Sequence, residues 1–237
     1  MDLYQYYQEI FDSSNITMNE SLKKADELAK VHAFVDDLLT WYDVLKPREE
    51  AVILTYAAGE LQLSTLSLVA GLYRQSFTSL RLALELSLST IFFSTNELDF
   101  REWRNGERDI YWQQLVCTDS NTQGIFSSRW AKGFFPELID FVKEYNKIAK
   151  DVYRDLSEFV HGNAYTWEVN KAHIVFNDAL FKKWLNNFFN LSQVISFALC
   201  LRFMKSLDSQ KLHRLESHLL ESLGHIEEIR RILGGSV

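Results

Sequence analysis

Apolar residues recur along most of the chain every three or four positions, which is the spacing of one face of an α-helix. Leu28, Val35 and Leu38, for instance, fall on one side of a helix over 19–45. The pattern predicts helices in the first dozen residues (ending near Ser13), 19–45, 47–68, 72–95, 136–161, 178–207 and from Asp208 to Gly234. Few, long helices predict an all-α bundle with long antiparallel helices.

Two short segments depart from the helical spacing. A polar loop is predicted at 118–124, and apolar and polar residues alternate at 165–169 and 173–176. Alternation is typical of strands, so a small peripheral β-hairpin is predicted near 164–177. We find no repeat, low-complexity tract or linker, and therefore expect one all-α domain over 1–237.

Composition supports this fold class and argues against secretion and against a membrane span in 178–207. Of 237 residues, only 9 are glycine and 2 are proline, which agrees with few turns between long helices. Cys117 and Cys200 are too few for a disulfide framework, and the N-terminus lacks the features of a secretory signal, so we expect a cytoplasmic protein. Asn190 and Arg202 interrupt the apolar centre of 178–207, so no membrane span is expected there.

The predicted helix over 136–161 carries a line of basic side chains opposite its apolar side. The line consists of Lys143, Lys147, Lys150, Arg154 and His161, which fall within a sector of roughly 60° on a helical wheel. The formal net charge of −7 argues against non-specific coating of nucleic acid, but it leaves room for a local basic groove. A solvated face is the common alternative for such a run of charges.

The end of this line favours a functional interpretation. Arg154 and His161 lie seven residues apart, so they stand almost above one another, roughly 10.5 Å along the axis. A planar guanidinium suits phosphate oxygens, and an imidazole exchanges a proton near neutral pH. Glu158 lies between them and is placed to orient His161 or to pair with Arg154. The set suits chemistry at a phosphodiester; the alternative is an ordinary surface ion pair beside an uninvolved histidine.

The same residues resemble a known family. Arg154, the polar Asp155, five further residues and His161 match the spacing of the HEPN superfamily motif, within the phrase YRDLSEFVHG and with LRLALE upstream. The resemblance is to HEPN proteins of bacterial toxin and anti-phage systems, and it covers an HEPN-like core of about 47–207. It implies a metal-independent endoribonuclease without a cofactor, built as a homodimer in which two motifs meet. It also implies a partner such as an antitoxin or another defence protein.

The resemblance further implies a mechanism and roles for individual residues. A ribose 2′-hydroxyl attacks the adjacent phosphate and leaves a 2′,3′-cyclic phosphate and a 5′-hydroxyl. Arg154 would stabilise the charge on the phosphorane, His161 would act as acid, base or phosphate orienter, and Asp155 fills the polar position of the motif. The three lysines of the line would bind the RNA backbone.

Four residues outside the motif are considered for secondary roles. The resemblance implies that Arg81 and Glu85, four residues apart on the most apolar helix, brace the site; a structural ion pair inside the fold is an equal alternative. Arg74, one heptad earlier, extends their polar stripe. Asn163 stands where some relatives carry a tyrosine that a partner enzyme modifies, so control by that route is not expected here.

Other candidate sites carry less weight. Residues 101–112 interleave bases and aromatics, as a surface for stacking single strands would, but acidic residues cancel the charge and favour packing and ion pairs. His213, His218 and His225 are spaced by five and seven, which does not suit metal ligation from one helix, so no metal site is expected. The leading hypothesis is thus a ribonuclease. The alternatives are a non-catalytic HEPN-like module that binds RNA, nucleotide or a protein partner, and a plain helical interaction protein.

Overall fold

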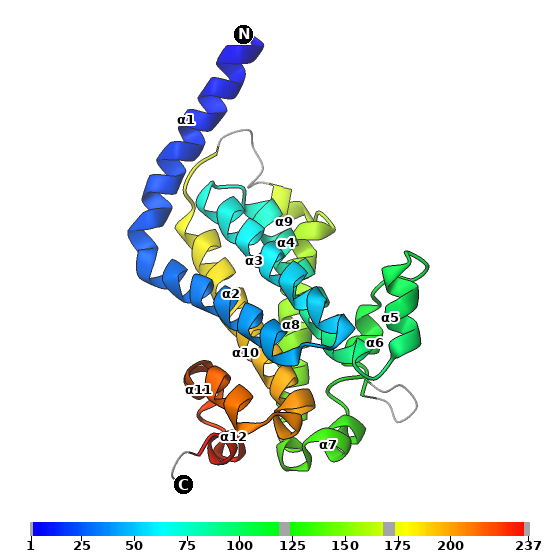
Figure 1. Ribbon diagram of the computed structural model, residues 1–237. Helices are drawn as coiled ribbons and strands as arrows, with labels where there is room; N and C mark the ends of the chain where they lie inside the picture. Colours follow the sequence, from blue (N-terminus) through cyan, green and yellow to red (C-terminus); the bar gives the residue numbers. More distant parts are fainter. Residues whose placement is uncertain (1, 119–123, 168–173, 235–237) are drawn as a thin grey trace.

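The computed structural model describes residues 2–118, 124–167 and 174–234, and every regular element in these ranges is a helix. The α-helices are α1 (Leu3–Ser21), α2 (Ala25–Leu45), α3 (Ile53–Val69), α4 (Tyr73–Phe93), α5 (Glu97–Arg104), α6 (Trp112–Val116), α7 (Ser128–Phe134), α8 (Val142–Val160), α9 (Ala164–Trp167), α10 (Asp178–Phe203), α11 (Ser209–Leu223) and α12 (Glu227–Ile232) (Figure 1). Short 3-10 turns are η1 (Leu22–Lys24), η2 (Glu49–Val52), η3 (Pro136–Leu138) and η5 (Met204–Ser206). The predicted all-α fold is confirmed.

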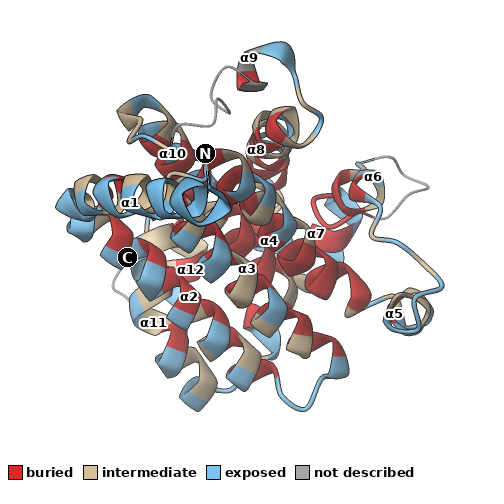
Figure 2. Ribbon diagram, turned by 90° about the horizontal axis from the view of Figure 1, so that it is seen from above, coloured by how far each residue is buried: buried red, intermediate tan, exposed pale blue. Residues whose placement is uncertain are grey.

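Helix α4 lies at the centre of the bundle, between α3 on one side and α8 on the other, and α10 packs against both α4 and α8. Figure 2 shows buried residues concentrated on the inner faces of these helices, whereas little of α1 is buried. Phe77 of α4 and Phe159 of α8 stack with ring centroids 3.8 Å apart and planes 4° apart. Burial of a side chain of this size stabilises the fold by about 2 kcal/mol. This contact fixes α8 against the centre of the bundle.

The N-terminal helix is longer than predicted. The serines near residue 13 were expected to end it, but α1 continues to Ser21. Their hydroxyls find acceptors on backbone carbonyls: Ser13 Oγ donates to Glu9 O at 2.8 Å, and Ser14 Oγ donates to Ala70 O at 3.0 Å. Satisfied in this way, the hydroxyls do not compete with the backbone ladder, so the helix does not stop.

Three predicted helices are each divided by a break. The helix expected over 19–45 spans the end of α1, then η1, then α2. The helix expected over 136–161 begins as η3 and resumes as α8 at Val142. The last helix is capped as expected, since Asp208 Oδ1 accepts from the Lys211 N–H at 2.9 Å, but it breaks at Gly224 into α11 and α12.

The predicted hairpin is wrong in its first strand. Residues 164–167 form α9, because the backbone N–H and hydroxyl of Thr166 both donate to Asn163 O, at 2.8 and 2.7 Å, and start a helical turn. The second strand, predicted at 173–176, is wrong as well: 174–176 have no regular secondary structure, and 173 lies outside the described residues. After it, the Asn177 N–H donates to Tyr73 Oη at 2.7 Å, so no strand partner is required there.

One helical segment of the described chain, Glu49–Val69, is long and apolar enough to cross a membrane by length and composition alone. Of its most apolar window, 44% is buried inside the fold, chiefly through the contact of α3 with α4. A helix buried in a protein core meets the same criterion.

Candidate functional site on helix α8

Helix α8 has one buried and one exposed face. Its buried face, which includes Ala149, Val152 and Leu156, packs against α4 and α10. As the helical wheel predicts, all members of the basic line are exposed: Lys143, Lys147, Lys150, Arg154 and His161. The structure therefore brings the predicted catalytic pair and the predicted RNA-binding lysines onto one accessible surface.

Arg154 reaches into solvent and forms a local ion pair. Its side chain is 71% exposed, and its Nη2 lies 3.1 Å from Asp151 Oδ1, one turn earlier on α8. Glu158, the predicted partner, instead lies 3.8 Å from Lys183 Nζ on α10. An exposed pair such as Arg154–Asp151 contributes at most about 1 kcal/mol, so a phosphate group can displace the carboxylate at little cost.

His161 ends the helix. It is the C-cap residue, and Gly162 follows with φ +70°, a left-handed conformation that favours glycine. The Asn163 N–H donates to Glu158 O at 3.3 Å and closes the turn, so the predicted stop at Gly162–Asn163 is confirmed. Within the described chain, the imidazole of His161 has no hydrogen bond or ion pair, and it faces solvent.

Arg74 stands beside the same helix end. Its Nη2 donates to the carbonyl oxygen of Val160 at 3.3 Å, from α4 across to α8. Carbonyls at a helix C-terminus carry partial negative charge, so a guanidinium there is favourable. The polar stripe of α4 thus extends to the residue next to His161.

Arg81 and Glu85 form an ion pair, as both interpretations of them predict, and Arg81 also contacts α8. Arg81 Nη2 lies 3.2 Å from Glu85 Oε1 and donates to Tyr153 Oη at 2.5 Å. The guanidinium lies 4.5 Å from the centre of the Tyr153 ring, whose other contact is Trp112, stacked at 3.9 Å and 4°. Burial, and then the Glu85 carboxylate, raise the pKa of Tyr153, so its phenol stays neutral at physiological pH. We call Arg81, Tyr153 and Trp112 the Tyr153 clamp.

Sequence reasoning missed this clamp. Tyr153 precedes Arg154 directly, but nothing local marks it as a contact of Arg81, 72 residues away. Trp112 belongs to the stretch 101–112, whose pattern resembles a stacking surface for RNA, but it is buried against Tyr153. The arginines of the same stretch form ion pairs: Arg101 with Glu97, Arg104 with Glu49, and Arg108 with Asp99 and Glu102. The packing interpretation of that stretch fits these contacts.

Two predicted site residues lie to the side of the basic line. Asp155 is half-buried and is rotated by about 100° from Arg154 around the axis of α8. Asn163 has an exposed side chain, and its backbone carbonyl starts α9. The backbone of Asn163 thus closes the last turn of α8 and begins α9.

The three histidines of the C-terminal helices contact different partners. His213 Nδ1 lies 2.9 Å from Glu216, and His225 Nε2 lies 3.2 Å from Tyr145 Oη. In residues 2–118, 124–167 and 174–234, no group of three or more His, Cys, Asp or Glu side chains could hold a metal ion.

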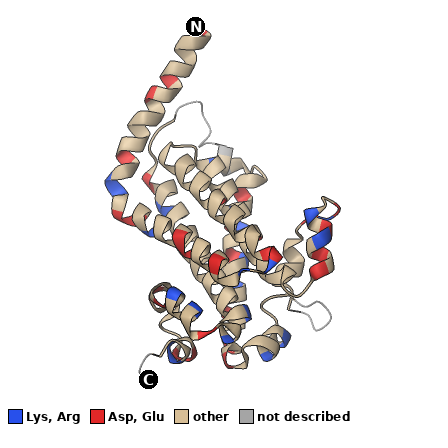
Figure 3. Cartoon of the chain, in the orientation of Figure 1, with Lys and Arg blue, Asp and Glu red and all other residues tan. Residues whose placement is uncertain are grey.

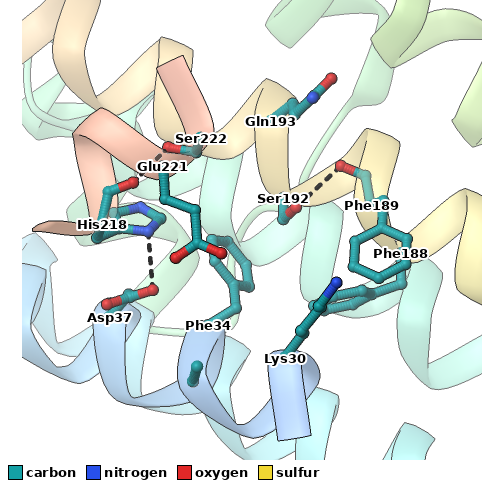
Figure 4. A pocket seen from close by; sticks show the side chains of 11 residues that line it. Lys30, Phe34, Asp37, Phe188, Phe189, Ser192, Gln193, His218, Glu221 and Ser222 are labelled. Carbon is teal, nitrogen blue, oxygen red and sulfur yellow. Dashed lines mark hydrogen bonds and ion pairs between the residues drawn. The ribbon is translucent and has the colours of Figure 1, made fainter. Parts of the chain in front are cut away.

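His218 belongs to a chain of polar groups that the sequence did not reveal. Its Nδ1 lies 2.7 Å from Asp37 Oδ2, and its Nε2 lies 3.0 Å from Ser196 Oγ. These are distances of a Ser–His–Asp triad. Figure 4 shows His218 and Asp37 at a cavity of about 270 Å³ between α2, α10 and α11. Ser196 is fully buried within α10 and does not line the cavity, so its hydroxyl is unsuited to attack a substrate and instead ties α11 to the bundle.

Comparisons with family models, with curated proteins and with solved structures find no match to this chain. The resemblance to the HEPN superfamily therefore depends on the motif and on its position at the exposed end of α8.

Proposed function

We propose that this protein is a metal-independent endoribonuclease of the HEPN type that acts as a toxin or an anti-phage effector. The observation that carries the proposal is the exposed basic line of α8, with Arg154 and His161 at its end and the buried face opposite. An RNA strand lying along the helix would meet three lysines and then the catalytic pair. Each lysine contact with a phosphate adds salt-dependent affinity that does not depend on sequence.

The reaction requires charge stabilisation and two proton transfers. The 2′-hydroxyl loses its proton and its oxygen bonds to phosphorus, while the bond from phosphorus to O5′ breaks and O5′ gains a proton. Arg154, once it exchanges Asp151 for a phosphate oxygen, stabilises the extra negative charge of the phosphorane. His161 supplies a group that takes or gives a proton near neutral pH.

A second copy would complete the site. One imidazole cannot be both the base at the 2′-hydroxyl and the acid at O5′ in a single step, so two histidines are needed. Arg154 is largely surrounded by water in one chain, whereas electrostatic stabilisation is strongest where water is excluded. Pairing of two α8 surfaces would supply the second histidine and exclude that water.

The experiment is digestion of total cellular RNA by purified protein in EDTA, beside His161→Ala and the matched control His213→Ala. His213 is also an exposed histidine, on α11. We expect wild type and His213→Ala to leave 2′,3′-cyclic phosphate ends and His161→Ala to be inactive. Cleavage by His161→Ala at the wild-type rate would overturn the assignment of the site.

A second candidate is a module that binds RNA through the same line without cutting it. Arg154 is paired with Asp151 and is exposed to water, so in a single chain it is better placed to bind a phosphate than to stabilise a transition state. Salt-dependent RNA binding by the wild type, with no cyclic-phosphate ends, would support it over the ribonuclease.

A further inference from the structure

Large apolar side chains are exposed on two surfaces far from the basic line of α8. On α1, Leu3, Tyr4, Tyr7 and Phe11 are 53–76% exposed. On α3, Tyr56, Leu63 and Leu66 are 52–62% exposed. Scattered exposed residues need no explanation, but contiguous apolar patches mark interaction sites.

The apolar residues of α1 continue a seam that is already used inside the chain. Leu3, Tyr7, Ile10, Ser14, Thr17 and Ser21 alternate in steps of four and three, which is the spacing of a helix-packing seam. The second half of this seam sits on the end of α3, where Ser14 Oγ and Ser21 Oγ donate to Ala70 O and Val69 O at 3.0 and 3.3 Å. The first half runs beyond the body of the molecule, as Figure 1 shows, and its Leu3 and Tyr7 side chains are exposed.

Such a free segment needs a partner. About nine residues of α1, from Leu3 to Phe11, stand beyond the contact with α3, and isolated helices shorter than about 12 residues are marginal in water. Packing of the apolar side of a helix is what normally stabilises it. A surface of matching shape on another chain would stabilise it.

The outer face of α3 has that shape. Tyr56, Gly59, Leu63, Leu66 and Ala70 follow one another in steps of three and four, the same spacing as the seam of α1. A Cβ atom added to Gly59 would meet no atom within 4 Å, so nothing in this chain requires glycine there. Glycine is disfavoured inside helices. Here the missing side chain leaves a depression on the helix surface between Tyr56 and Leu63, into which a large side chain of another helix would fit. We call these five residues the α3 seam.

Charge disfavours two other partners for α1. Asp2, Glu9, Asp12 and Glu20 lie on or next to α1, and the first basic residue of the chain is Lys23 (Figure 3). Two α1 helices packed together would bring like charges together, and an anionic membrane surface would repel α1. Within α3, the charged residue is Glu60, so a contact between α1 and the α3 seam is formed chiefly by apolar side chains.

We infer that two copies of this chain exchange their N-terminal helices, each laying the first three turns of α1 on the α3 seam of the other. An aromatic side chain buries about 150 Å² or more, so two arms with three or four large side chains each bury about 2,000 Å² with the seams that receive them. Stable complexes bury about 1,200–2,000 Å² in total. The contact lies on the other side of α4 from α8 and does not rest on the ribonuclease proposal.

Cross-linking tests this geometry directly. Each chain carries one new thiol, Tyr7→Cys or Leu63→Cys, in a Cys117→Ser background because Cys117 is only half-buried; Cys200 is fully buried. We expect oxidation of an equimolar mixture to give a disulfide-linked species of twice the 27.7 kDa chain mass. Neither variant alone should give it, and neither should a mixture of Tyr7→Cys with Ser128→Cys on α7.

Each other result would overturn the proposal. Cross-linking of Tyr7→Cys with itself would show pairing between two α1 helices. A wild type that is monomeric by light scattering at 100 µM, or an assembly whose mass is the same in the wild type, Tyr7→Glu and Leu63→Glu, would show that the exchange does not form the assembly. Both side chains are largely exposed, so these substitutions leave the helical circular dichroism of the chain unchanged if the fold is intact.

Discussion

Arg154 and Asp151 sit one turn apart on α8, and the carboxylate holds the guanidinium in the resting chain at 3.1 Å. The two residues therefore have opposite expected effects on RNA. Arg154 offers positive charge to a phosphate, whereas Asp151 both competes for the guanidinium and repels the phosphate. The pair is exposed, so neither effect should act through the stability of the fold.

We predict that Arg154→Ala lowers the rate of RNA cleavage by about 100-fold or more, because a donor to the phosphorane is lost. Arg154→Lys should recover only part of the rate, since an ammonium lacks the planar fork of a guanidinium. Asp151→Asn should tighten RNA binding several-fold. Single-turnover rates and binding titrations measure these effects. If Arg154→Ala lost its activity because it was unfolded at the assay temperature, as its melting temperature would show, the assigned role would be contradicted.

At the scale of the element, the orientation of α8 decides whether the basic line is presented at all. Packing against α4 and α10 determines the position of α8, and the Tyr153 clamp fixes the rotation of the helix about its axis next to Arg154. A rotation of α8 by one residue position, about 100°, would turn the whole basic line, Arg154 included, away from its exposed position. The clamp thus acts on the site through position, without touching the substrate.

We predict that Tyr153→Ala destabilises the protein by about 2 kcal/mol, since a half-buried aromatic side chain loses its stack. It should also lower kcat more than it weakens RNA binding, because the lost contacts lie next to Arg154, whereas the three lysines lie earlier on α8. Tyr153→Phe keeps the stack on Trp112 and should retain most of both properties. Tyr111→Ala, at an exposed tyrosine nearby, is the matched control for urea unfolding and cleavage assays. Equal losses of kcat in Tyr153→Phe and Tyr153→Ala would argue that the hydroxyl, and not the ring stack, is needed.

The basic line of α8 could be predicted from the sequence because it depends only on the period of a helix. The cap at Asp208 and the helix end at Gly162 could be predicted because each involves residues within one or two turns of each other. The length of α1 was not, because Ser14 is satisfied by Ala70, 56 residues away. The Tyr153 clamp likewise depends on contacts between distant segments.

At the scale of the whole molecule, the basic line lies on a chain whose formal net charge is −7. The rest of the surface therefore repels RNA, and this repulsion extends about 10 Å at 0.1 M salt. Affinity for RNA must come from the few basic side chains that meet phosphates closely. The molecule should bind RNA only where the line is accessible.

We predict that replacing Lys143, Lys147 and Lys150 by Gln lowers the slope of log affinity against log salt by about 2, because each phosphate contact on a single strand contributes about 0.7. A matched variant with Gln at Lys23, Lys46 and Lys132 changes the net charge equally at exposed sites elsewhere. Its slope should stay near that of the wild type. Equal slopes for the two variants would show that net charge, and not the line, governs binding.

The central position of α4 has a consequence for assembly. The α3 seam and the basic line of α8 lie on opposite sides of that helix, so a chain that uses both surfaces has a valence of two. Two self-complementary contacts of this kind close into a tetramer when their two-fold axes cross at right angles, whereas axes that do not meet link molecules into an open polymer. The angle between the two surfaces across α4 would then set whether the assembly has a fixed size or lengthens as the protein accumulates.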